Sequence, residues 1–322
     1  MAAIGTHRVC RNVVPMATAR SLLVDPEQAL NYHLVSRCVR RSWLCGWDKR
    51  SRKDYSHRKD ALEKRLFRLV RCFAVELHGF AIMSNHFHLV VRYDPLACAQ
   101  WSAQEVAQRW VAAVAPQGVL ENALRRQAMV ESLVAEPDDI ERLRQRLGSL
   151  SAFMQHLKQP IARQANGEDK VKGHFFEQRF YSGALLCEQA LLAAMAYVDL
   201  NPVRARLAKD IEHCDHTSIA RRLKANSAER LERLLEPLAS GLAVDEGAQL
   251  SMTLQGYVDV LRVLAAIGPP SLQPNVPIPA RMRRWAQQVA TLAKRQRAFG
   301  HQQQLTHWLE RRNMRALETP LA

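Results

Sequence analysis

The chain has 322 residues, 48% of them hydrophobic, which excludes an intrinsically disordered protein and suffices for one large domain with additions or for two domains. No uninterrupted apolar run reaches the roughly 18 residues of a membrane helix, and residues 1–16 lack the apolar core of a secretory signal. The seven cysteines form no CxxC pair, which fits a reducing compartment. We therefore expect a soluble cytoplasmic protein. The formal net charge of +15 favours a polyanionic partner, with nucleic acid ahead of a membrane surface.

The N-terminal part predicts a leader, a strand and a helix. Residues 1–28 are expected to form a poorly structured leader that ends near Asp25-Pro26. A first strand is predicted at 32–39, where β-forming residues alternate, and a loop at 43–55. An amphipathic helix with a solvated cationic face is predicted from residue 56 to 73, because apolar residues recur there at helical spacing: Leu62, Leu66, Leu69 and Phe73.

Residues 74–93 predict two strands joined by a tight polar turn at Ser84-Asn85. Side chains alternate between the two faces of a strand, so His86 and His88 lie on one face and Phe87 on the other. Two imidazoles on a rigid strand can bind a metal ion. Taken alone, a His-x-His pair is more often part of a partly solvated sheet face.

The chain becomes helical after Asp94-Pro95, and we expect an inserted helical region at about 96–165. Helices are predicted at 101–115, at 121–135, and from an N-cap at Asp138 to a break or kink at Pro160.

A further strand is predicted at 174–181, interrupted at Ser182-Gly183. A strong helix follows at 188–200 and is stopped by Asn201-Pro202, because proline disfavours helical geometry in the residue before it.

The order strand, helix, strand, strand, helical insertion, strand, helix predicts an α+β domain with an antiparallel sheet and helices on one face. We place this domain at 29–220 and a helical, basic C-terminal region at 221–322, divided by a proline-rich link at 269–279. Residues 281–315 contain nine Arg and Lys residues and one acidic residue, Glu310.

Tyr197 and Asn201 stand four residues apart on the predicted helix and therefore share a face. Tyrosine offers a phenol as a nucleophile, and asparagine offers a carbonyl oxygen suited to a hard divalent cation. Separately, a tyrosine at the edge of a core and an asparagine at a helix end need no function. Beside His86 and His88 they predict a metal site with open positions for the oxygens of a phosphodiester.

Residues 83–89 (Met-Ser-Asn-His-Phe-His-Leu), followed downstream by 197–205 (Tyr-Val-Asp-Leu-Asn-Pro-Val-Arg-Ala), resemble the single-tyrosine HUH transposases, most closely the REP-associated tyrosine transposases. Segments 32–37 and 173–180 and Ser182 support the resemblance, which covers roughly residues 30–220 in the same order. The resemblance implies a ferredoxin-like antiparallel sheet with helices, the HUH endonuclease fold.

By this resemblance, His86 and His88 would ligate Mg²⁺ or Mn²⁺ with Asn201 as the third ligand. Tyr197 would attack the scissile phosphate of single-stranded DNA, giving a 5′-phosphotyrosine link and a free 3′-hydroxyl that can later rejoin DNA. The implied partner is single-stranded DNA with hairpin or repeat structure, in the nucleoid. The long insertion and tail leave the oligomeric state and the mobility of the element open.

Several residues that flank this site in sequence are candidates for contacts with DNA phosphates. They are His33, Arg37, Arg40, Arg41, Arg179, Arg204 and Arg206. His33 could equally be a stacked core residue.

Two other functions stay open. One is a non-catalytic DNA-binding regulator derived from a transposase, against which the intact set of His86, His88, Tyr197 and Asn201 weighs. The other is a metal-dependent phosphodiesterase that uses water, which leaves Tyr197 without a role.

Overall fold

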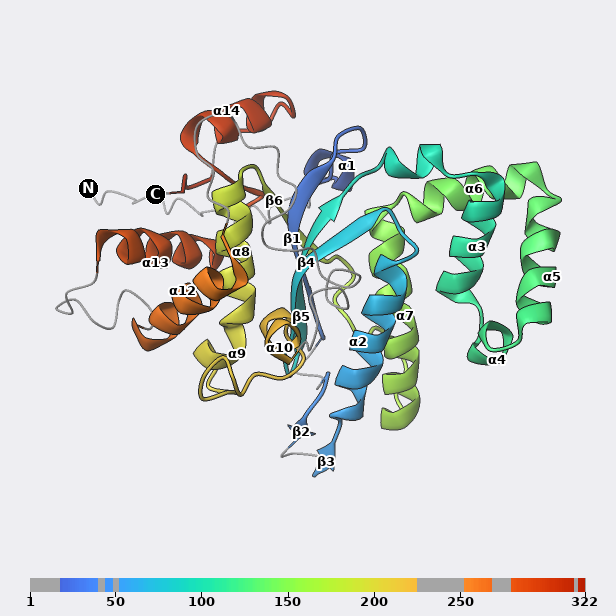
Figure 1. The fold of residues 1–322 in the computed structure, drawn as a ribbon, viewed down its shortest axis with the longest axis horizontal. Helices are drawn as coiled ribbons and strands as arrows, with labels where there is room; N and C mark the ends of the chain where they lie inside the picture. The colour runs from blue at the N-terminus through green and yellow to red at the C-terminus, as the bar shows by residue number, and fades with distance from the viewer. Residues whose placement is uncertain are drawn as a thin grey trace, which may run out of the picture.

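A five-stranded sheet in the order β4-β5-β1-β6-β7 lies between two layers of helices (Figure 1). The strands are β1 (Leu30–Arg37), β4 (Val75–Ile82), β5 (His86–Tyr93), β6 (Tyr181–Leu185) and β7 (Ala298–Phe299). The computed structural model describes residues 18–39, 44–48, 52–224, 252–267, 279–315 and 318–321. The predicted α+β class is confirmed.

The strand pairing confirms the hairpin and adds an edge strand. β4 and β5 are antiparallel, the amide of Met83 donates to the carbonyl of His86 across the turn, and β1 pairs antiparallel with both β5 and β6. β7, from the C-terminal region, pairs parallel to β6. The sheet is therefore mixed, and the expectation of a purely antiparallel sheet was wrong at this edge.

Helices cover both faces of the sheet, so the expectation of helices on one face was also wrong (Figure 1). On one side, α2 (His57–Val70) and α7 (Leu150–Asp169) pack against each other over Phe87 and Leu89. On the other side, α8 (Glu188–Asp199) packs over Val90. A strand with consecutive apolar residues has to be covered on both faces.

The inserted region places its helices beyond α2 and α7 (Figure 1). It consists of η1 (Ala97–Gln100), α3 (Ala103–Val114), α4 (Gln117–Leu120), α5 (Ala123–Val134) and α6 (Pro137–Leu147).

The single helix predicted from Asp138 to Pro160 is two helices, with α6 ending at Leu147 and Ser149 capping α7 through the amide of Ala152. Asp138 is not the N-cap of α6, because Glu136 holds that position. α7 continues through Pro160, where burial of Leu157 and Ile161 outweighs the local preference of proline.

The strand predicted at 174–181 begins only at Tyr181, and residues 174–180 are irregular apart from an isolated bridge between Cys38 and Phe176. β6 then runs through Ser182-Gly183 without a break. A Cβ on Gly183 would come within 2.7 Å of the Phe299 ring. This glycine therefore permits close packing of the C-terminal segment rather than a turn.

The remaining elements differ from expectation in detail. Residues 1–17 lie outside the described residues, while Arg20–Leu23 within the expected leader form α1. The expected loop at 43–55 contains a small hairpin of β2 (Trp47–Asp48) and β3 (Lys53–Asp54).

The C-terminal region packs on the sheet layer, since α13 contacts α8 and β7 joins the sheet. Two short helices follow α8, α9 (Asn201–Arg204) and α10 (Ser218–Lys224). The later described helices are α12 (Leu254–Ile267), α13 (Ala280–Leu292) and α14 (Gln302–Glu310). Of the predicted proline-rich link, residues 268–278 lie outside the described residues. None of the described helices is long and apolar enough to cross a membrane.

Arg58, predicted on the solvated face of its helix, is fully buried. Its Nε and Nη2 atoms donate to Glu168 at 2.7 Å and to Asp169 at 2.8 Å, and its guanidinium lies 3.9 Å from the centre of the Tyr55 ring. These contacts join the start of α2 to the end of α7.

We expect Arg58→Met to lower the free energy of unfolding by about 3 kcal/mol or more, because removing one partner leaves the others of a buried ion pair uncompensated. Arg142→Met, which removes the exposed pair with Asp139 on α6, should cost less than about 1 kcal/mol. Urea denaturation of both variants measures the difference. Equal losses would contradict the structural role of Arg58.

Candidate functional site

Three histidines meet on the α8 side of the sheet. His86 and His88 project from β5, and their ring centres are 4.8 Å apart. His33 projects from the neighbouring strand β1, where its Nε2 atom lies 2.9 Å from Nδ1 of His88 and the two rings stack. The pairing register of β1 and β5 sets this contact, because it places His33 and His88 on the same face of adjacent strands.

Tyr197 on α8 and Asn201, the first residue of α9, reach the same histidines. The Tyr197 ring centre lies 5.7 Å from those of both His33 and His88. The side-chain nitrogen of Asn201 lies 3.4 Å from Nε2 of His88. The structure thus brings His86, His88, Tyr197 and Asn201 together within one chain.

The hydrogen bonds of His86 and His88 put the ring proton of each on Nδ1, and Nε2 of His88 accepts from the Asn201 amide. Nδ1 of His86 lies 2.6 Å from the side-chain oxygen of Asn85, which can only accept, so Nδ1 carries the proton. For His88, the Asn201 amide donates toward Nε2, so the ring proton is on Nδ1 and is donated to His33. A ligand histidine whose other nitrogen donates a hydrogen bond is held in the tautomer that binds a metal.

The three imidazoles are neutral at neutral pH. Burial lowers the pKa of His33 to about 3 and that of His86 to about 4, and it lowers the pKa of His88 well below 6.5. Positive charge on Arg295 lowers all three pKa values further, and Arg37 adds to the effect on His86 and His88. The cluster is therefore a set of uncharged nitrogen donors in a positively charged surrounding.

Two of the predicted arginines flank the cluster. The guanidinium carbon of Arg204 lies 6.0 Å from the centre of the Tyr197 ring, and Arg37 ends β1 opposite His86. Within the described residues, the Nε atoms of both arginines are buried without a hydrogen-bond partner. Buried donors of this kind are available to an anionic ligand.

The other predicted arginines are not brought to the histidines in this way. Arg179 donates to the carbonyl of Thr18 at 3.1 Å, and Arg206 is exposed in a left-handed conformation after α9. Arg40 and Arg41 lie outside the described residues.

Sequence reasoning missed two neighbours of the site, Tyr181 and Arg295. The Tyr181 ring centre lies 5.8 Å from that of His33, and its hydroxyl donates to the carbonyl of Gln296. That bond holds the segment before β7 beside the cluster and with it Arg295. No local signal predicts this contact, because it depends on the pairing of β7 with β6.

A buried carboxyl group fixes the junction of α8 and α9, which carry Tyr197 and Asn201. Asp199 is fully buried and accepts hydrogen bonds from the hydroxyl of Ser218 at 2.5 Å, the amide of Ile219 at 2.8 Å and the hydroxyl of Tyr257 at 2.8 Å. Its partners on α10 and α12 therefore set the position of the C-terminal end of α8.

We expect Asp199→Ala to lower the free energy of unfolding by about 3 kcal/mol or more, since it leaves several buried donors without an acceptor. Asp259→Ala, at an exposed position on α12, serves as the control and should cost less than about 1 kcal/mol. Chemical denaturation checks both values, and a loss below about 1 kcal/mol for Asp199→Ala would show that the network does not hold α8.

No protein-family model and no curated protein matches the sequence. Among solved structures, that of a REP-associated tyrosine transposase bound to a REP hairpin aligns with 68% of this chain and 92% of its own, at 11% sequence identity. Its TM-score is 0.35, too low to carry an argument about this chain. The site is therefore interpreted from its own geometry.

Proposed function

We propose that the chain is a metal-dependent enzyme that cleaves and rejoins single-stranded DNA through Tyr197, as a tyrosine transposase does. The observation that supports this most is the position of the Tyr197 ring, 5.7 Å from that of His88, with Asn201 3.4 Å from the same histidine. A phenol and three side chains that can bind a metal ion lie together, which a tyrosine at the edge of a core does not require.

His86, His88 and Asn201 would hold Mg²⁺ or Mn²⁺. The donor set fits a divalent cation, because both imidazoles are neutral and present Nε2, and rotation of the Asn201 amide would offer its oxygen. Imidazole nitrogen suits Mn²⁺ better than Mg²⁺. Such an ion offsets negative charge that builds up on the phosphate oxygens during displacement.

The chain's own groups account for the other parts of the reaction. The phenol oxygen of Tyr197 forms a bond to phosphorus as the bond to the 3′ oxygen breaks, so the phenol loses a proton and the leaving 3′-hydroxyl gains one. The 5′-phosphotyrosine conserves the energy of the phosphodiester, and a 3′-hydroxyl can reverse the exchange. Arg37 and Arg204 would bind the phosphates on either side.

The proposed fold is that of HUH endonucleases, in which two histidines on a central strand face a helix with the tyrosine. The antiparallel strands β4, β5, β1 and β6 and the helix α8 support this assignment. The net charge of +15 supports a nucleic-acid substrate, which we propose is single-stranded DNA with hairpin or repeat structure.

Incubation with Mn²⁺ and a labelled single-stranded hairpin oligonucleotide should give a covalent adduct on a denaturing gel. We expect Tyr197→Phe to abolish the adduct because the nucleophile is lost. Tyr93→Phe is the matched control, since it removes a buried phenol from the far end of β5 on the opposite face of the sheet and should retain the adduct.

Two results would contradict the proposal. Free cleavage products that persist in Tyr197→Phe would indicate a phosphodiesterase that uses water, and binding without any cleavage would indicate a DNA-binding regulator.

His33 is proposed to position His88 rather than to bind the metal. We expect His33→Phe to raise the dissociation constant for Mn²⁺ by about 10-fold to 100-fold, because it keeps an aromatic ring but removes the hydrogen bond to Nδ1 of His88. Electron paramagnetic resonance titration measures free Mn²⁺ without an activity assay. His78→Phe, a buried histidine on β4, should bind Mn²⁺ as the parent does, and equal affinities for all three proteins would refute the role of His33.

A further inference from the structure

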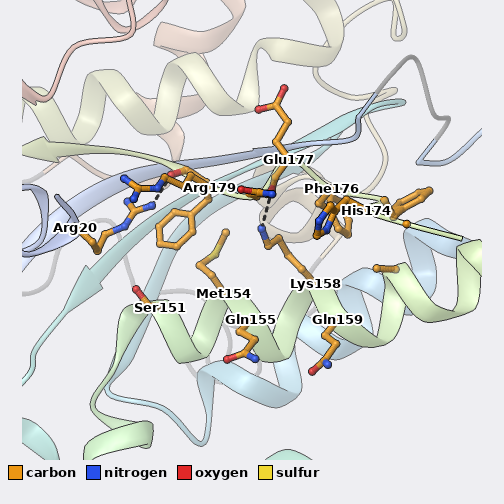
Figure 2. Close-up of a pocket in the computed structure, with 15 residues that line it drawn as sticks. Arg20, Ser151, Met154, Gln155, Lys158, Gln159, His174, Phe176, Glu177 and Arg179 are labelled. Carbon is orange, nitrogen blue, oxygen red and sulfur yellow. Dashed lines mark hydrogen bonds between the residues drawn. The ribbon is translucent and has the colours of Figure 1, made fainter. Parts of the chain in front are cut away.

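A groove of about 650 Å³ lies on the opposite side of the sheet from the histidines, between α7 and the irregular segment 173–180 (Figure 2). Phe175, Phe176 and Phe180 line it and belong to the core that packs with α2 and α7. It is therefore separate from the candidate site, which faces α8.

Three cationic side chains line this groove: Arg20, Lys158 and Arg179. Arg20 donates to the hydroxyl of Ser182 at 2.7 Å and lies 3.8 Å above the centre of the Phe180 ring. Figure 2 shows Arg20 and Arg179 at one end and Lys158 in the middle, where its Nζ atom lies 3.4 Å from the carbonyl oxygen of Glu177.

These cations form no ion pair within the described part of the chain, although one acidic residue, Glu177, is among those that line the groove and its charge raises the pKa of Lys158. Figure 2 shows the Glu177 carboxylate pointing away from α7. Arg20, Lys158 and Arg179 form no ion pair among the described residues, whereas the partly buried Arg297 and Arg312 are paired with carboxylates. Burial lowers the pKa of Arg20, as does the charge of Arg179, and burial and Arg20 lower the pKa of Lys158. Like charges held together without a counter-ion favour binding of an external anion.

The two stretches of sequence that continue from Thr18 and from Val39 contain no acidic residue. Residues 1–17, which precede the Thr18 carbonyl that binds Arg179, contain no Asp or Glu. Residues 40–43, which follow the Val39 amide that donates to Phe175, read Arg-Arg-Ser-Trp. Among the described residues that line the groove, Glu177 is the one acidic side chain.

An exposed imidazole, that of His174, lies at the other end of the groove. Figure 2 places His174 and Phe176 beyond Lys158, away from Arg20 and Arg179. The His174 side chain is exposed and can stack on a base, whereas the Phe176 ring, 5.7 Å from the Lys158 amine, is buried in the core. Cations that follow a backbone, beside rings on which bases stack, are typical of sites for single-stranded nucleic acid.

We propose that this groove binds the phosphates of a single-stranded DNA segment, as a second contact on the face opposite His86 and His88. The choice of DNA as the ligand rests on the proposed function, but binding in the groove requires neither the metal nor Tyr197. A strand that contacts both faces would be held independently of its cleavage.

Binding of a fluorescein-labelled 12-nucleotide oligo(dT) is measured by anisotropy in EDTA, with the full chain. We expect Lys158→Met combined with Arg179→Gln to raise the dissociation constant at least about 10-fold at 0.1 M salt. The slope of log affinity against log salt should become shallower by about 1.4, since each DNA phosphate that a cation no longer neutralises accounts for about 0.7. Arg125→Gln combined with Arg126→Gln, on the distant helix α5, removes the same charge and should change the dissociation constant less than about 3-fold.

Three outcomes decide the proposal. A selective loss in the groove variant supports it. Equal losses in both variants would show only a general effect of charge and overturn it. If the groove variant loses binding of dTMP but binds oligo(dT) as the parent does, the groove is a site for a free nucleotide. That result would overturn its role in strand binding.

The Tyr197→Phe protein separates this inference from the proposed function. It should bind oligo(dT) in EDTA with the parent affinity, because the groove does not use the phenol. Failure of the parent chain to form a covalent adduct would contradict the proposed function while leaving the groove measurement intact.

Discussion

The position of α8 depends on the buried carboxylate of Asp199, and the candidate site depends on the position of α8. Asp199 accepts hydrogen bonds from Ser218, Ile219 and Tyr257, which ties the helix to two later segments of the chain. Tyr197 lies two residues before Asp199 in the sequence, and Asn201 lies two residues after it. A displacement of this anchor would move both groups relative to the histidines, and catalytic arrangements tolerate little displacement.

The opposite half of the site is held by the sheet. Strands restrict side-chain directions more than loops do, so the register of β1 and β5 alone sets the contact of His33 with His88. Burial of the His33 and His88 imidazoles carries a cost, and the Nδ1 atom of His33 is without a hydrogen-bond partner in the described structure. Polar groups that a stable core would avoid are expected at functional sites.

The excess positive charge has two different roles in the molecule. Arg58, Arg297 and Arg312 are paired with carboxylates and join distant segments of the chain. Arg37 and Arg204 near the histidines, and Lys158 in the groove on the other face, form no ion pair with a carboxylate in the described parts. Net charge by itself does not separate these roles, because partners in an ion pair come together only on folding.

The sequence by itself determined the local features: the hairpin with His86 and His88 on one face, the shared helical face of Tyr197 and Asn201, and the helices of the insertion. Each follows from a repeat of two or nearly four residues over a short stretch, and such repeats fix local side-chain directions. Only the tertiary structure decided that α8 covers the second face of the sheet, that Arg58 is buried, and that β7 brings Arg295 beside the histidines. These features depend on contacts between residues that lie a hundred or more positions apart, and local periodicity carries no information about which distant segments pair.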